Sequence, residues 1–135
     1  MTDYSKRRKR GMAILKKMGR EQLMLDQKAL LPEMYEMSVG HLFGDVWARP
    51  GLSLRDRQLV TLAANIALAR PSGNYSHYRS AKHIGITHRE ICEVMIQVGH
   101  YAGWPAISNA VRQYTAVLEE DEQIRKGKKK KPTLV

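Results

Sequence analysis

The chain has 135 residues and a mass of 15.4 kDa, which suits a single domain, and its 43% hydrophobic and 27% charged residues exclude a wholly disordered chain. No stretch approaches the roughly 18 uninterrupted apolar residues of a membrane span, and no long apolar run follows the basic N-terminus. The single cysteine excludes an intramolecular disulfide. We therefore expect a reduced, cytoplasmic protein with no membrane partner.

The net charge of +10 is concentrated at the two ends of the chain. The runs Lys6–Arg10 and Lys128–Lys131 repel themselves and favour solvated segments. We predict a basic flexible N-terminus over 1–11, one helical domain over 12–123 and a basic flexible tail over 124–135. Such ends can bind nucleic acid without specificity, but no nucleic-acid-reading motif accompanies them. Nucleic acid is therefore a possible partner that the sequence does not favour.

Helical spacing recurs along the first third of the chain. Residues 12–31 are predicted to form one helix, and Pro32 suits the first turn of a second helix. The second helix carries an apolar face at helical spacing, made of Tyr35, Val39, Leu42, Phe43 and Val46. The sequence Arg49-Pro50-Gly51 then breaks the chain.

Four further helices follow. Ser53 can cap the first of them, and a turn at 71–74 precedes a helix over about 75–84 that ends at Gly85. Thr87 and Glu90 have the spacing of a capping box, and the helix that they begin is apolar around most of its circumference over 91–98, so we expect other helices to enclose it. The sequence Gly103-Trp104-Pro105 starts the last helix. About six helices and no convincing strand predict an all-α fold.

Most catalytic patterns are absent. The histidines are His41, His77, His83, His88 and His100, and no two of them stand at the i, i+4 spacing of a helical metal-binding histidine pair, since His77 and His83 are six residues apart, so no metal site is expected. No Ser/His/Asp arrangement and no phosphate-binding glycine loop is present, which disfavours a nucleotide enzyme. Cys92 lies in the helix expected to be enclosed and is predicted to be a buried, inert thiol.

The densest polar stretch, 74–83, is either a surface helix or a site for an anionic substrate. In a site, His77 would be the general acid or base, and Arg79 and Lys82 would supply positive charge. Residues two apart do not share a helix face. Arg79 would therefore reach the site of His77 only if its long side chain folds round, or else it acts elsewhere, for example at a neighbouring subunit.

Three segments in order resemble the carboxymuconolactone decarboxylase family, and the resemblance covers about 35–118. They are the segment 43–57 continued by 59–64, the sequence His77-Tyr78-Arg79-Ser80-Ala81 with Gly85 eight residues after the histidine, and the segment 101–106 with Asn109. The wider superfamily includes alkyl hydroperoxidase D-like proteins, which use a Cys-x-x-Cys pair before the histidine and a helix glutamate. In this chain the two cysteine positions fall on Arg70 and Gly73, and the glutamate position falls on Gln58. Because the cysteine pair is missing, a thiol peroxidase that relies on Cys92 is the least favoured function.

The resemblance implies an alkyl hydroperoxidase D-like helical bundle that forms a hexamer or trimer. It also implies a cofactor-free decarboxylation, with no metal, of a small anionic lactone such as 4-carboxymuconolactone from aromatic-compound degradation. In that reading His77 is the proton donor. The residues expected to bind the substrate or line its pocket are Arg49, Arg57, Arg79, His100, Tyr101 and Trp104.

The chain departs from the family pattern at His100, at Gln97 and in the turn 74–76, so another small acid is an open alternative as substrate. A second alternative is a non-enzymatic helical oligomer that binds polyanions through its basic ends.

Overall fold

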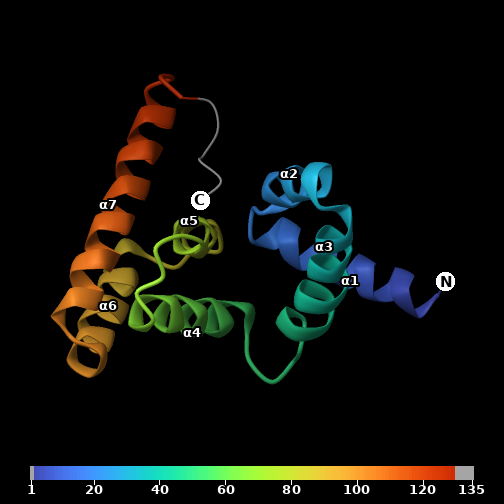
Figure 1. Cartoon of the computed structure of the whole chain (residues 1–135), viewed down its shortest axis with the longest axis horizontal. Coiled ribbons are helices and arrows are strands. Elements are labelled where there is room, and N and C mark those ends of the chain that lie inside the picture. The colour runs from blue at the N-terminus through green and yellow to red at the C-terminus, as the bar shows by residue number, and fades with distance from the viewer. Residues whose placement is uncertain (1, 130–135) are drawn as a thin grey trace. The chain divides into compact units, whose positions relative to one another are not determined.

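The computed structural model describes residues 2–129, in which all regular secondary structure is helical (Figure 1). The helices are α1 Asp3–Lys17, α2 Glu21–Leu30, α3 Pro32–Met37, the π-helix η1 Ser38–Trp47, α4 Leu54–Ala67, α5 Asn74–His83, α6 His88–Ala102 and α7 Trp104–Arg125. The prediction of an all-α fold is confirmed. The chain forms two compact units, Met1–Arg57 and Gln58–Val135, which we describe separately.

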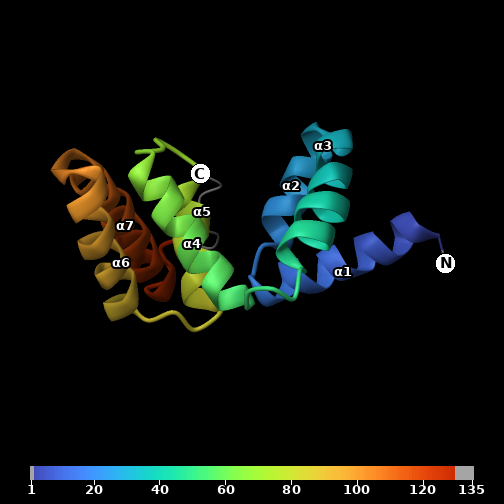
Figure 2. The ribbon, with the colours of Figure 1, turned by 90° about the horizontal axis from the view of Figure 1, so that it is seen from below.

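In the first unit, α1 packs closely against η1 (Figure 2). A Cβ atom on Gly11 of α1 would lie 1.9 Å from the carbonyl oxygen of Val39, and one on Gly44 of η1 would lie 2.4 Å from the carbonyl oxygen of Arg7. Only glycine allows the two backbones to approach so closely. Both positions are buried, so this glycine contact is part of the interior of the unit.

The N-terminal basic residues are part of this packing. Residues 3–11, for which a flexible segment was expected, are helical, and Thr2 caps α1 by accepting a hydrogen bond from the Ser5 amide. Arg7 makes a bidentate contact with Asp45 of η1, and Arg10 bonds the same carboxylate at 3.2 Å. The carboxylate of Asp45 explains why this part of the positive run can fold against the rest of the unit.

The single helix expected over 12–31 is interrupted. Gly19 adopts a φ of +66°, a conformation that L side chains rarely take, and the chain turns there between α1 and α2. Pro32 begins α3, as predicted. The chain therefore has more helices than the sequence pattern suggested.

The second unit packs α5, α6, α7 and most of α4 around one apolar core. α6 and α7 lie side by side and are joined at Gly103, and α5 packs against α7 (Figures 1 and 2). The core takes residues from all four helices and Ile86 from the connection between α5 and α6; the helical residues are Leu62, Ile66, Tyr78, Ala81, Ile91, Met95, Ala110, Tyr114 and Val117.

Local signals for the helix ends are confirmed. Ser53 Oγ accepts from the Asp56 amide at 3.0 Å, Thr87 and Glu90 form the capping box, and Gly85 has a φ of +87°. The enclosure expected for α6 is incomplete, because Ile96 is 55% exposed. No helix between residues 2 and 129 combines the length and hydropathy that a bilayer span requires.

The predicted domain limits stay predictions. α7 continues to Arg125, beyond the expected end of the domain at 123. The expected tail, 124–135, lies outside the described residues from position 130 onwards.

Candidate functional site

His77 is the fourth residue of α5, at the end of its first turn, and it is half-buried. Its Nδ1 is 3.2 Å from Nε2 of Gln58, a fully buried residue on α4. α5 begins after Gly73, whose φ of +84° turns the chain into the helix. An imidazole in this position has one ring nitrogen fixed by a buried amide, which sets the orientation of the ring.

The face of α5 next to His77 is buried. Asn74 and Tyr78 are four residues apart, so they share this face of the helix, and both are fully buried. The Tyr78 ring packs on Tyr114 of α7 with ring centroids 5.0 Å apart. Burial raises the pKa of the Tyr78 phenol.

The sequence reading missed the buried role of Gln58, Asn74 and Tyr78. The i, i+4 spacing of Asn74 and Tyr78 was the signal that could have identified this polar face of α5. Nothing in the spacing of Gln58 and His77, 19 residues apart, indicates their contact.

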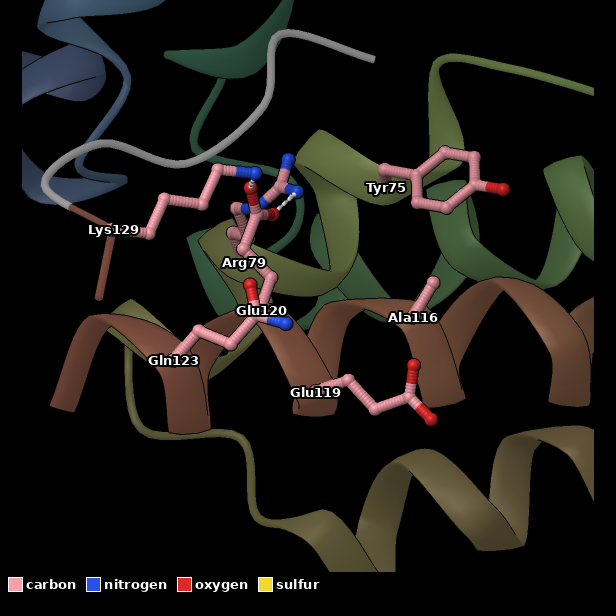
Figure 3. Close-up of a pocket in the computed structure, with 7 residues that line it drawn as sticks. All are labelled: Tyr75, Arg79, Ala116, Glu119, Glu120, Gln123 and Lys129. Atoms are coloured by element: carbon pink, nitrogen blue, oxygen red, sulfur yellow. Dashed lines mark hydrogen bonds and ion pairs between the residues drawn. The ribbon is translucent and has the colours of Figure 1, made fainter. Parts of the chain in front are cut away.

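Arg79 occupies another side of α5 and forms an ion pair with Glu120 of α7 (Figure 3). Lys129 pairs with the same carboxylate at 2.5 Å. These side chains border a pocket of about 310 Å³, whose lining residues are Tyr75, Arg79, Ala116, Glu119, Glu120, Gln123 and Lys129. The two cations face two glutamates, so the formal charges of the lining cancel.

A second ion pair lies one position along α7. Lys82 of α5 pairs with Asp121, and both side chains are about one-third exposed. The basic residues of α5 that were considered for substrate binding thus both have a carboxylate partner on α7.

The remaining residues of the expected site fall into two groups. Arg49 and Arg57 belong to the first unit, where Nη2 of Arg57 donates to the Arg49 carbonyl oxygen at 3.0 Å. In the second unit, the rings of His100 and Trp104 meet edge to face, with centroids 5.4 Å apart. Tyr101 is 88% exposed.

His100 and Trp104 border an almost wholly apolar groove of about 330 Å³ between α6 and α7. The other lining residues are Cys92, Met95, Ile96, Gly99, Ile107 and Val111. The structure therefore brings His100 and Trp104 to one surface, and among the described residues His77 lines neither this groove nor the pocket of Arg79.

Cys92 is half-buried, which differs from the expected burial. Its Sγ lies 3.6 Å from Nε2 of His88, and the other ring nitrogen of His88 is 3.0 Å from the Tyr114 hydroxyl. The difference arises because part of the α6 surface lines the open groove. Within residues 2–129, no cluster of three or more histidine, cysteine or acidic side chains could hold a metal ion.

Comparison with known proteins identifies the family. Residues 32–116, from α3 into α7, match the carboxymuconolactone decarboxylase family. The chain is 36% identical over 78 residues to the 4-carboxymuconolactone decarboxylase of Acinetobacter baylyi, covering 58% of each chain. It is 34% identical over 90 residues to a nitrosuccinic acid decarboxylase of Metarhizium robertsii, covering 67% of this chain and 62% of the relative. The chain thus spans about three-fifths of these relatives, and it belongs to the carboxymuconolactone decarboxylase family.

Proposed function

We propose that the protein is a cofactor-independent carboxy-lyase for a small carboxylic acid, with His77 as the proton donor. Two relatives named as decarboxylases support the type of reaction, and their names give two different acids, a carboxylated lactone and a nitro-substituted succinic acid. Both compounds carry an electron-withdrawing group that can accept an electron pair. We take this shared feature as the substrate class, with 4-carboxymuconolactone as the first candidate.

The reaction divides into two steps. The bond between the carboxylate and its carbon breaks, CO₂ leaves, and the electron pair moves into the electron-withdrawing group of the substrate. A proton is then added to carbon, so that one proton from solvent is consumed for each CO₂ released. The protein has to stabilise the delocalised anion and deliver this proton, which are electrostatic and general-acid tasks.

The observation that carries the proposal is the placement of His77. It is half-buried, and the amide of Gln58 holds its Nδ1 at 3.2 Å, so that Nε2 is the ring atom through which a proton would pass to the substrate. A general acid needs such a defined orientation before its substrate arrives.

Arginines supply the carboxylate binding in this proposal. Arg49, Arg57 and Arg79 are the candidates because a guanidinium binds a carboxylate through two parallel hydrogen bonds. Arg79 would have to exchange its contact with Glu120 for the substrate. Replacing each arginine by lysine in turn tests which of the three binds the substrate, because loss of a bidentate contact to the substrate raises KM.

The apolar groove supports a second part of the proposal, namely a homo-oligomer such as a trimer or hexamer. Ile96, Trp104 and Val111 of this groove are at least half exposed in the single chain. Contiguous apolar surface of this kind marks protein–protein contacts. Light scattering on the purified protein measures the state of association, and a strictly monomeric protein would refute this part.

The test of the proton donor is His77→Ala, assayed by CO₂ release from 4-carboxymuconolactone and related acids. The matched control is His83→Ala, an exposed histidine at the end of the same helix. We expect the first variant to keep its helical circular dichroism and lose turnover by about 100-fold or more, as the loss of a general acid does, while the control keeps its activity. Full turnover in His77→Ala would refute the role of His77.

A further inference from the structure

We propose that Gln58 is a positioning residue whose side-chain amide holds His77 in both of its charge states. In the described state Nε2 of Gln58 contacts Nδ1 of His77 at 3.2 Å. The other atom of the same amide, Oε1, is buried and has no hydrogen-bond partner among the described residues. The role of His77 as proton donor rests on the proposed function, whereas the contact itself does not.

The donor and acceptor rules define the present state. An amide NH₂ group can only donate, so the Nδ1 that it contacts has to accept and carries no hydrogen. The neutral imidazole then has its proton on Nε2. As long as its NH₂ group faces Nδ1, as in the described structure, Gln58 thus favours the neutral tautomer of His77 that carries its proton on Nε2.

The unpaired carbonyl oxygen of Gln58 is the atom that would pair with His77 in its second charge state, the imidazolium. When His77 gains a proton, both ring nitrogens become donors, and the NH₂ of Gln58 no longer fits Nδ1. A half-turn about the last side-chain torsion of Gln58 exchanges its nitrogen for Oε1, which then accepts from the Nδ1 hydrogen. The ring keeps its place while its charge changes.

A purely structural role does not account for this residue. A buried carbonyl without a partner destabilises the fold, and a methionine of similar length would remove that cost. Gln58 is 0% exposed, so bulk solvent does not supply a hydrogen-bond donor to its carbonyl oxygen. The value of the amide therefore lies in its contact with the imidazole.

The reaction makes use of both states. The imidazolium gives its Nε2 proton to the substrate carbon, the N–H electron pair stays on Nε2, and the new C–H bond uses the pair left by CO₂. Nε2 then takes a proton from water. Throughout this cycle the amide of Gln58 presents whichever atom matches Nδ1.

Two variants separate the amide's functions. Gln58→Glu has nearly the same shape but can only accept, and Gln58→Met can do neither. The charged side chains that follow His77 on α5, Arg79 and Lys82, pair with Glu120 and Asp121 of α7, and neither substitution changes these four residues, so differences between the proteins report on position 58.

The first measurement is ¹⁵N NMR of the His77 ring in the full chain, which needs no substrate. We expect the neutral wild-type ring to carry its proton on Nε2, and the neutral ring of Gln58→Glu to carry it on Nδ1. The titration of the ring in Gln58→Glu should move to higher pH by about one unit or more, because a carboxylate favours the imidazolium. The same tautomer and titration in both proteins would overturn the proposal.

The second measurement is the kinetics and thermal stability of Gln58→Met. We expect a Tm equal to or above that of the wild type, kcat reduced at least 10-fold, KM little changed, and an altered pH profile of kcat. An unchanged kcat and pH profile in Gln58→Met would overturn the positioning role. If His77→Ala keeps full turnover, the proposed proton donor fails, but the NMR result still decides the Gln58–His77 contact.

Discussion

Arg79 of α5 and Glu120 of α7 form an ion pair whose side chains are only 16% and 7% exposed. The two residues are 41 positions apart, so the pair holds together helices that are distant in the sequence (Figure 3). Removal of one partner from a buried pair leaves the other charge without compensation, which costs more than the intact pair contributes.

We therefore expect Glu120→Gln to lower the free energy of unfolding by about 3 kcal/mol in urea titrations. The double variant Arg79→Met, Glu120→Leu should recover most of this loss, because both charges of the buried pair are gone and Lys129, which also contacts Glu120, is 40% exposed to solvent. Asp121→Asn is the control, since its pair with Lys82 is about one-third exposed and should contribute less than about 1 kcal/mol. Equal losses in Glu120→Gln and Asp121→Asn would contradict the role assigned to burial.

A second prediction concerns the contact between α1 and η1. Gly11→Ala places a Cβ atom 1.9 Å from the Val39 carbonyl oxygen, which is backbone and cannot rotate away. Alanine favours a helix by about 1 kcal/mol over glycine, but we expect the clash to dominate and to destabilise the protein by about 3 kcal/mol. Gly51→Ala is the control because nothing lies within 4 Å of its Cβ position. Similar melting temperatures for the two variants would refute the close approach.

Features that depend on residues close together in the chain could be predicted from the sequence. The capping box of Thr87 and Glu90 and the left-handed conformation of Gly85 follow from local hydrogen bonds and from the lack of a side chain, and both are confirmed. The all-α fold follows from helical spacing in the same way. His77 was also chosen from sequence, and its role stays a prediction.

Contacts between distant segments were not predictable from the pattern. Residues 3–11 were expected to be flexible because their charges repel. They are helical, and the carboxylate that binds Arg7 belongs to Asp45, which is distant in the sequence. The partner of Arg79 comes from position 120, and that of His77 is Gln58, which reads as an ordinary polar residue in the sequence. Each of these contacts depends on packing that brings two helices together.

The third prediction follows from Asp45. Hydrogen bonding with Arg7 holds the pKa of this carboxyl below its ordinary value. In the unfolded chain an aspartate titrates near pH 3.9. The contribution of Asp45 to stability is therefore complete above about pH 4 and is lost as the pH falls through the lower pKa of the folded state.

Thermal melts between pH 7 and pH 2 test this prediction. We expect Asp45→Asn to have a lower Tm than the wild type at pH 7 and to show a smaller further decrease on acidification. Asp26→Asn, on the surface of α2, serves as the control and should follow the wild type. Parallel curves for Asp45→Asn and the wild type would show that the Arg7 contact has no effect on stability.

The last prediction concerns alkaline pH and Tyr78. Burial raises the pKa of this phenol, whereas the tyrosine of an unfolded chain ionises at about pH 10. The unfolded state thus loses a proton that the folded state retains, so the free energy of unfolding falls as the pH rises above about 10 and is unaffected below that value.

Tyr78→Phe removes the ionisable phenol and should make the free energy of unfolding less sensitive to pH between about pH 10 and 12. Tyr101→Phe is the matched control, because Tyr101 is 88% exposed whereas Tyr78 is fully buried. Urea midpoints measured at pH 8 and pH 11 compare the three proteins, and an equal decrease in Tyr78→Phe and the wild type would rule out Tyr78 as the source of alkaline sensitivity.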